Sequence, residues 1–277
     1  MTIMVTGATG HVGRHVVQGL VEAGRRVRAV TRDPARAAFP AGVEVVAGDL
    51  HDPESLDFDG VERLYLFPVP ATAQQVMERA KGVERIVVLS SGAVTFGMDT
   101  EFHLPVERAV EASGAEWTHV RAGEFALNRL FMWGPSVRAD GTIWDPNPDA
   151  VSFPMHERDI ADVAVRALLE DGHAGQAYTL TGPEVLTARQ QAARIGNAIG
   201  RELRFRDVTV AEALEFYRRQ GGFAAQMAPF LLGAEGYEGD EAEPDWEITP
   251  SGEVERILGR PGRTFAQWAH DHREDWM

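Results

Sequence analysis

The segment "TGATGHVG" near the N-terminus constrains the fold more than any other part of the chain. It follows a short apolar run, "TIMVT" (2–6), and precedes a stretch in which apolar residues recur at helical spacing. Gly7 permits a tight turn, Gly10 lets the backbone approach a pyrophosphate, and Gly13 lets helix and strand pack closely. The N-terminus of the helix that follows would then bind the negatively charged pyrophosphate. The motif predicts a dinucleotide site; the alternative is a turn that only packs.

The first half of the chain alternates between strand-like and helix-like patterns. Alternating units of this kind predict an α/β fold of Rossmann type, a doubly wound parallel sheet covered on both faces. The stretch between Asp49 and Arg63 is too short for a full helix, so we expect an abbreviated crossover there. The further strands are expected at 27–31, 43–47, 63–67, 85–90, 116–121 and 176–182, and the helices at 71–81, 104–113 and 157–172.

The second half begins several helices at threonine. Helices are expected to start at Thr187, Thr209 and Thr264, the last two with the pattern of a capping box. The glycine-rich, acidic stretch 233–246 predicts a mobile loop.

The predicted domain organisation is a nucleotide-binding core followed by a smaller lobe. We expect residues 1–150 to form the core, with 157–182 returning to pack on it. Residues 183–277 are expected to form a smaller C-terminal α/β lobe that binds the substrate.

Composition excludes several classes of protein. The 277 residues contain no cysteine, which removes disulfides and thiolate chemistry and fits a reducing, cytoplasmic location. The net charge of −15 disfavours binding to nucleic acid. No apolar run approaches the roughly 20 residues of a membrane span, and the N-terminus does not resemble a signal peptide. We expect no membrane partner, and leave open whether the chain is a monomer or a homodimer.

The end of the second predicted strand, "AVTRDP", bears on cofactor choice. NAD binders usually place an acid here for the ribose hydroxyl, whereas this chain has Thr31 and Arg32. A guanidinium can make a forked, charged contact with a 2′-phosphate, which favours NADP(H) over NAD(H). The alternative is a solvated surface arginine, with Asp33 beside it. Asp49, after the third strand, could accept from the adenine amino group or could cap its own loop.

Several motifs in order carry a family resemblance. The segments "TGATGHVGRHVV", "VRAVTRDPA", "IVVLSSGAV", "HLPVERAVEASGAEWTHVRAGEFALN" and "DIADVAVRALL" together resemble an atypical short-chain dehydrogenase/reductase of the NmrA-like group. That group includes NADPH-dependent quinone oxidoreductases, triphenylmethane reductases and redox-sensing regulators that bind NADP without catalysis. The resemblance implies an NADP-binding Rossmann core, a small C-terminal lobe and a substrate bound in the cleft between them.

The resemblance also implies which residues would contact the cofactor. Ala122 stands where many relatives have proline. The implied contacts are Gly7, Thr9, Gly10, His11, Val12 and Gly13 at the pyrophosphate, Arg32 at the 2′-phosphate, Asp49 and Leu50 at the adenine, Phe67 and Pro68 at the ribose, Ser90 and Ser91 at the nicotinamide ribose, and Glu124 near the nicotinamide.

Proton transfer cannot follow the usual scheme of this superfamily, a tyrosine followed four residues later by a lysine. None of the four tyrosines has that spacing, and Lys81, the one lysine, precedes the fifth strand, at the edge away from the ligand. His103, after the fifth strand, is the candidate catalytic residue. It could donate a proton, contact the nicotinamide ribose, or only start its helix. Glu107 could orient it or be a solvated helix acid.

Aromatic and methionine side chains suggest a pocket for a flat apolar ligand, although each could instead belong to the core of the lobe. No spacing predicts a metal site. We predict an NADPH-dependent oxidoreductase that passes hydride to a quinone-like or conjugated molecule; the alternatives are a non-catalytic NADP(H)-binding redox sensor and a tailoring enzyme of a biosynthetic pathway. The expected pocket residues are Phe125, Asn128, Phe131, Trp133, Met155, His156, Phe223, Met227 and Phe230.

Overall fold

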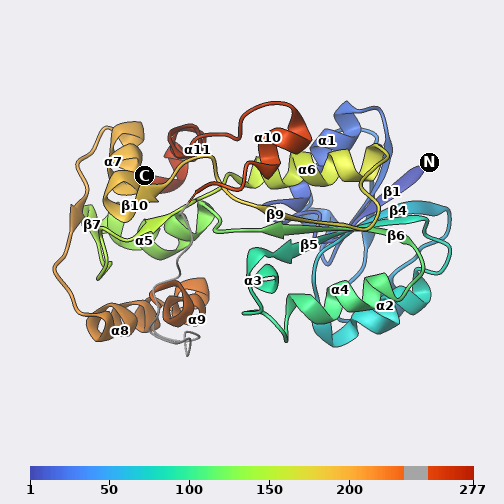
Figure 1. Cartoon of the computed structure of the whole chain (residues 1–277), viewed down its shortest axis with the longest axis horizontal. Helices are drawn as coiled ribbons and strands as arrows, with labels where there is room; N and C mark the ends of the chain where they lie inside the picture. The colour runs from blue at the N-terminus through green and yellow to red at the C-terminus, as the bar shows by residue number, and fades with distance from the viewer. Residues whose placement is uncertain (234–248) are drawn as a thin grey trace. The chain divides into compact units, whose positions relative to one another are not determined.

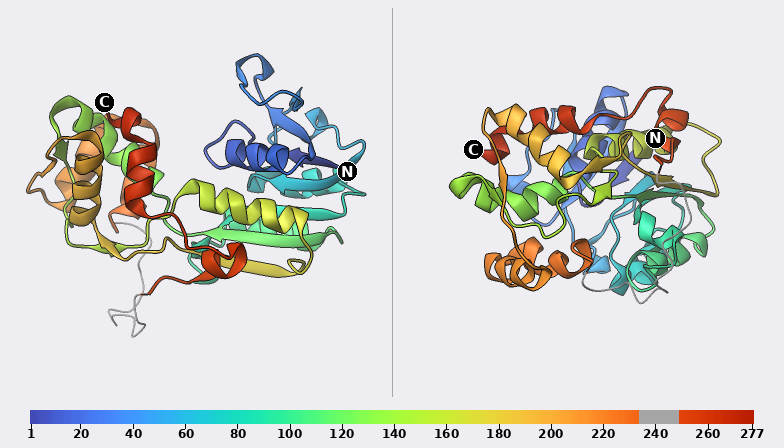
Figure 2. Two further views of the ribbon diagram at one scale, coloured as in Figure 1. Left: turned by 90° about the horizontal axis from the view of Figure 1, so that it is seen from above. Right: turned by 60° about the vertical axis from the view of Figure 1, so that its left-hand side comes forward.

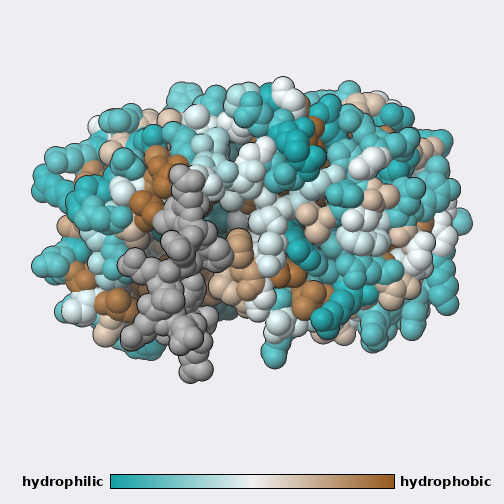
Figure 3. Space-filling view, viewed as in Figure 1, coloured by the Kyte–Doolittle hydropathy of each residue, from teal (hydrophilic) through white to brown (hydrophobic). Residues whose placement is uncertain are grey.

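The computed structural model describes residues 1–233 and 249–277, so the predicted loop 233–246 lies almost wholly outside the described residues. No helix within these two ranges is long and apolar enough to cross a membrane. The face shown in Figure 3 is mostly hydrophilic, with apolar residues in small groups. The chain forms two compact units: the first is Met1–Gly123, Glu157–Leu180 and Gly252–Pro261, and the second is Glu124–His156, Thr181–Ser251 and Gly262–Met277.

The first unit is built on a seven-stranded sheet in the order β3-β2-β1-β4-β5-β6-β9 (Figure 1). Every neighbouring pair is parallel, so all the carboxyl ends lie at one edge, as the doubly wound prediction required. The order reverses between β1 and β4, where open α/β sheets bind ligands. The strands are β1 (Thr2–Val5), β2 (Arg26–Thr31), β3 (Glu44–Ala47), β4 (Val61–Leu66), β5 (Arg85–Ser91), β6 (Glu116–Ala122) and β9 (Gln176–Leu180).

Helices cover both faces of this sheet. On one face α1 packs against α6, and on the other α2 packs against α4 (Figures 1 and 2). The crossover between β3 and β4 contains only a short 3₁₀ turn, as its length predicted. The helices are α1 (Gly13–Glu22), α2 (Ala73–Arg79), α3 (Gly92–Thr95), α4 (His103–Glu111), α6 (Glu157–Leu169) and α10 (Glu253–Leu258), with 3₁₀ turns η1 (Pro34–Arg36), η2 (Pro53–Ser55) and η3 (Pro70–Thr72).

The central strands are apolar because both faces of the sheet are covered. Ile3, Met4 and Val5 of β1 are each 0% exposed, and β5 is buried over almost its whole length.

The second unit is mainly helical. Its short strands form two pairs, β7 with β11 in parallel and β8 with β10 in antiparallel fashion. The elements are α5 (Leu127–Asp140), β7 (Thr142–Ile143), β8 (Val151–Ser152), β10 (Leu186–Thr187), α7 (Ala188–Ile199), β11 (Arg204–Phe205), α8 (Val210–Gln220), α9 (Gly222–Leu231), α11 (Phe265–Asp271) and η4 (Arg273–Trp276).

All three helix starts predicted at threonine are confirmed. Each threonine side chain accepts from a backbone N–H in the first turn, and the side chain three residues later bonds back to the threonine backbone. A capping box is present at the first of them as well, which the sequence reading did not include. The boxes join Thr187 to Gln190, Thr209 to Glu212 and Thr264 to Gln267.

The division between the units differs from the predicted one. Residues 124–150 were expected in the core, but α5 places Trp133 and Val137 in the second hydrophobic core, with Trp268. The amphipathic pattern of α5 could not show which core it would join. Residues 157–180 do return to the first unit, where β9 pairs with β6.

Candidate active site

The glycine turn has the geometry that its spacing suggested. Gly7 has a φ of 58°, a left-handed conformation that favours glycine, and its carbonyl accepts from the N–H of Gly10 at 2.9 Å. A Cβ on Gly13 would lie 2.2 Å from the Gly7 carbonyl oxygen. The first turn of α1 therefore closes onto the loop in a way that only glycine allows.

Helix α1 begins without a side-chain cap. Thr9, Gly10 and His11, just before it, are exposed, whereas Val12 and Gly13 are buried. A helix N-terminus of this kind presents backbone N–H groups and the positive end of its dipole. Gly13 is packed against backbone, whereas Gly10 is exposed and a Cβ there would lie 3.1 Å from the Gly7 carbonyl oxygen. A turn of this shape is suited to the pyrophosphate of a dinucleotide.

Arg32 lies exposed just past the carboxyl end of β2. Within residues 1–233 and 249–277, no hydrogen bond or ion pair is found for its guanidinium. Asp49 accepts from the backbone N–H of His51 at 2.9 Å and lies 3.1 Å from its Nδ1. These bonds are the main reason that the pKa of Asp49 is lowered, and Arg32 adds a smaller part. One Asp49 oxygen thus caps its own loop, the alternative that the sequence left open.

The end of β4 contributes apolar surface beside the glycine turn. Phe67 is 42% exposed and its Cβ would lie 3.0 Å from a Cβ on Gly7. Its backbone N–H donates to Thr6 Oγ1 at 2.8 Å, which ties the ends of β1 and β4 together. Pro68 and Leu50 are buried. Phe67 is therefore the one of these three predicted contacts that offers a large accessible side chain.

The two serines that end β5 are used differently. Ser91 accepts from the N–H of Ala93 and caps α3. Ser90 is 2% exposed and donates to Glu107 Oε1 at 2.6 Å. Ser90 is therefore a structural donor within this unit, and only Ser91 has part of its surface accessible.

Glu107 has neither of the two roles considered from the sequence, and both were wrong. It is 1% exposed rather than solvated, and its hydrogen bonds go to Ser90 and Arg121, not to His103. Arg121 donates to both carboxylate oxygens, at 2.9 and 2.7 Å. Burial would raise the pKa of Glu107, but the bonds from Arg121 and Ser90 outweigh it and lower the pKa. Glu107 lies on α4 and Arg121 on β6, so sequence spacing could not indicate that the two side chains form an ion pair.

Folding also assembles a group that no sequence spacing indicated. Glu107, Glu111 and His119 place potential ligand atoms within 4.8 Å of one another, and they are the only such group that the described part of the chain contains. The Arg121 guanidinium already occupies both oxygens of Glu107, and Glu111 lies 3.1 Å from His119 Nε2. The arrangement is therefore an ion-pair network rather than an open coordination site.

His103 is the first residue of α4, and its side chain is 22% exposed. Its Nδ1 lies 2.5 Å from Asp99 Oδ2. The sequence reading missed Asp99, although its position four residues before the histidine was an available signal.

The tyrosines of the described residues do not resemble acids at a ligand site. Tyr65 and Tyr217 are each 1% exposed, and burial raises the pKa of both phenols. Tyr178 is buried and pairs with His173 at 2.8 Å. Lys81 lies between α2 and β5, before the amino end of that strand, as expected.

The predicted pocket residues all belong to the second unit, as does Glu124, which pairs with Arg129 at 3.0 Å. Phe131 and Phe223 form an aromatic contact at 4.9 Å. Three of the nine are buried, namely Trp133, Met155 and His156. Two are exposed, Phe223 and Phe230, and the other four are partly exposed: Phe125, Asn128, Phe131 and Met227.

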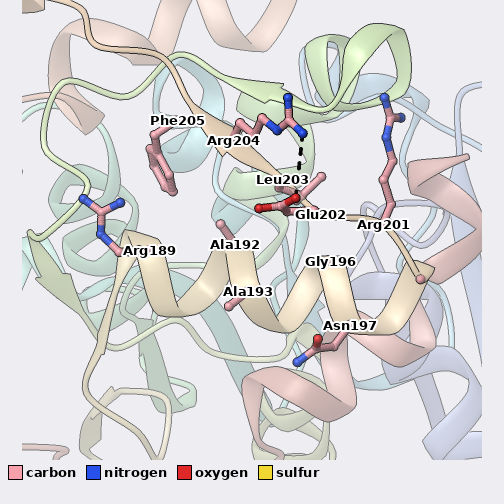
Figure 4. A pocket seen from close by; sticks show the side chains of 11 residues that line it. Arg189, Ala192, Ala193, Gly196, Asn197, Arg201, Glu202, Leu203, Arg204 and Phe205 are labelled. Carbon is pink, nitrogen blue, oxygen red and sulfur yellow. Dashed lines mark ion pairs between the residues drawn. The ribbon is translucent and has the colours of Figure 1, made fainter.

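A hollow of about 680 Å³ in the second unit is lined by none of these nine residues. It lies along α7 and β11, with Ala192, Gly196 and Leu203 among its small and apolar lining residues (Figure 4). Arg189 and Arg201 stand at opposite ends of α7 and do not converge. The third lining arginine, Arg204, pairs with Glu202 at 3.8 Å, so the hollow offers no focused anion site.

The parallel sheet and the glycine cradle define a Rossmann-type fold with a turn suited to binding a dinucleotide. A family model described as "NmrA-like family" matches residues 1–84. The chain is 36% identical to "(4-alkanoyl-5-oxo-2,5-dihydrofuran-3-yl)methyl phosphate reductase" of Streptomyces griseus, over 98% of both chains. It is 33% identical to "NAD(P)H azoreductase" of Xenophilus azovorans, over 98% of this chain and 97% of the other.

A solved structure shows the same relationship. An NADPH-dependent quinone oxidoreductase of Escherichia coli, complexed with NADPH, is 26% identical with a TM-score of 0.78, over 98% of this chain and 99% of the other. The chain belongs to the NmrA-like family of atypical short-chain dehydrogenases/reductases. Family and cradle together define an NAD(P)H-dependent reductase.

Proposed function

We propose that this protein uses NADPH to reduce a quinone-like or otherwise conjugated small molecule. The observation that carries the proposal is the composition of the carboxyl edge of the sheet. The glycine cradle follows β1, and the exposed Arg32 follows the neighbouring strand β2. Arg32 stands in the position where NAD binders usually have an acid. Bound NADPH would supply a hydride, and the protein would supply position and a proton.

The acceptor class follows from the proton chemistry. Tyr65, Tyr178 and Tyr217 are buried, and Tyr237 lies outside the described residues. The single lysine lies before the amino end of β5, and no tyrosine precedes it by four residues in the sequence. A chain without a tyrosine–lysine pair is best suited to acceptors that stabilise the negative charge left by hydride addition. Quinones, azo compounds and conjugated carbonyl compounds do this, and the names of the relatives fall in the same range.

The test of the proposal is an NADPH fluorescence titration followed by addition of quinones, azo dyes and conjugated ketones, with loss of NADPH absorbance as the readout. Tight binding and acceptor-dependent oxidation are expected. Tight binding with no oxidation by any acceptor would contradict the reductase proposal and favour an NADP(H)-binding sensor.

Replacing Arg32 with alanine is expected to weaken NADPH binding about 10- to 100-fold, because a charge-assisted bond contributes about 1.5–3 kcal/mol. NADH binding should be unaffected, since NADH lacks the 2′-phosphate. Fluorescence titration with both cofactors measures the two affinities. Arg26→Ala, at the amino end of the same strand, is the matched control. Equal losses for both cofactors would remove the 2′-phosphate assignment.

Replacing His103 with alanine is expected to lower kcat about 100-fold, the usual contribution of a general acid, while NADPH affinity stays unchanged. Steady-state kinetics and titration separate the two effects. His270→Ala, an exposed histidine of the second unit, is the control. If NADPH affinity falls instead and kcat survives, His103 contacts the cofactor rather than donating a proton.

A further inference from the structure

Asp99 holds His103 and its helix at the same time. Its Oδ1 accepts from the backbone N–H groups of Phe102 and His103, both at 3.0 Å, and so holds the turn that leads into α4. Its Oδ2 lies 2.5 Å from His103 Nδ1. One carboxylate oxygen of Asp99 thus accepts from the backbone, and the other faces the imidazole.

This arrangement determines which ring nitrogen carries a proton. Burial would raise the pKa of Asp99, but hydrogen bonds from the His103 ring and from the two backbone N–H groups outweigh it, so the pKa is lowered. An ionised carboxylate can only accept, so the Nδ1 that faces it must be the donor. The neutral ring then carries its hydrogen on Nδ1, and the charged ring carries a second one on Nε2.

The ring is also fixed in orientation. The Phe102 ring lies 4.8 Å from the imidazole in an edge-on contact, with an interplanar angle of 66°. Nε2 has no hydrogen-bond partner within residues 1–233 and 249–277. Because Nδ1 faces Asp99, Nε2 is the nitrogen left for a ligand, and the ring as a whole keeps 22% exposure.

We propose that Asp99 is a positioning residue that fixes the tautomer and orientation of His103, so that Nε2 delivers the proton in the reduction. This inference rests on the proposed function. The acceptor gains a hydride at one atom and a proton at the oxygen or nitrogen where negative charge develops. Nε2 gives up that proton and regains it from water, and the proton on Nδ1 remains shared with Asp99 throughout.

Asp99→Asn separates the effect on the imidazole from the effect on the backbone turn. Asparagine keeps an acceptor oxygen for the two backbone N–H groups, so the turn into α4 should still form. Its single carbonyl oxygen cannot accept from the backbone and from Nδ1 at once, and its NH₂ group can only donate. If the oxygen stays bonded to the two backbone N–H groups, the NH₂ group faces Nδ1 and forces the hydrogen onto Nε2 of the neutral ring.

Two readouts make the test specific. Ring ¹⁵N NMR of His103, assigned by its loss in His103→Gln, should show a protonated Nδ1 in the wild type and the other tautomer in Asp99→Asn. With an acceptor found in the panel, kcat should fall about 10- to 100-fold, part of what a general acid contributes. NADPH affinity and the melting temperature should change little. Asp275→Asn, which alters the exposed partner of His272 at 2.7 Å in the second unit, should leave both readouts unchanged.

Each other outcome has a distinct meaning. Normal kcat in Asp99→Asn together with low kcat in His103→Gln would overturn the positioning role but leave the reductase proposal intact. A fall in NADPH affinity without a fall in kcat would overturn proton delivery. If the wild type reduces nothing, the proposed function and proton delivery fail together. Unchanged ring ¹⁵N shifts in Asp99→Asn would overturn tautomer control whatever the activity.

Discussion

Replacing Gly13 with alanine is expected to abolish useful NADPH binding and to destabilise the first unit. The added Cβ would lie 2.2 Å from the Gly7 carbonyl oxygen and 2.9 Å from its carbonyl carbon. Both are backbone atoms, so no side-chain rotation can relieve the clash. The loop or the first turn of α1 must move, at a cost of about 1–3 kcal/mol for overpacking. Each misplaced N–H contact to the pyrophosphate would weaken binding by about 10- to 100-fold.

The measurement is fluorescence titration with NADPH alongside urea unfolding. Gly24→Ala is the matched control, since Gly24 follows the other end of α1 with a φ of 69° and nothing near its Cβ position. That variant should lose about 1–2 kcal/mol of stability through backbone strain and keep its NADPH affinity. Wild-type affinity in Gly13→Ala would show that the loop is not the cofactor cradle.

Replacing Arg121 with methionine is expected to destabilise the protein by about 3–5 kcal/mol, the usual result of breaking a buried ion pair. Glu107 is 1% exposed and would keep only the bond from Ser90. Methionine retains much of the arginine stem, so the loss reports mainly the uncompensated carboxylate. Urea unfolding at pH 7 measures it.

The chain contains a surface pair with nearly the same geometry, which serves as the control. Arg218 donates to both oxygens of Glu215 at 2.7 and 2.8 Å, but their side chains are 70% and 46% exposed. Arg218→Met should cost less than about 1 kcal/mol, because water screens the pair. Similar losses for the two variants would mean that burial does not set the strength of the Arg121–Glu107 interaction.

The stability difference between the wild type and Arg121→Met should change with pH in a definite direction. The pKa of Glu107 is lowered in the folded protein, so its stabilisation is present above the ordinary carboxyl pKa and is lost as pH falls through the folded value. Without Arg121, burial should raise the pKa of Glu107 instead. The stability difference between wild type and Arg121→Met should therefore be largest near pH 7 and should narrow toward about pH 4.

The sequence predicted those features that depend on local chemistry. The glycine spacing, the seven principal strands and the threonine caps are short-range patterns, because turn conformation, strand alternation and capping depend on neighbouring residues. The abbreviated crossover followed from chain length alone. The predicted cofactor contacts, those of the glycine loop included, stay predictions, and Arg32 is the one that the proposed titration tests most directly.

Only the tertiary structure decided the features that join distant segments. One such feature is the unit that α5 joins, which sets the extent of each unit. It depends on which hydrophobic core the apolar face of α5 packs against. Neither of the two roles considered for Glu107 was right, because its partner Arg121 lies on another element, 14 residues away. Asp99 is close to His103 in sequence, but only the fold directs one of its oxygens to the backbone and the other to the ring. Spacing along a chain identifies the groups that are available, whereas burial and the geometry of packing decide which of them meet.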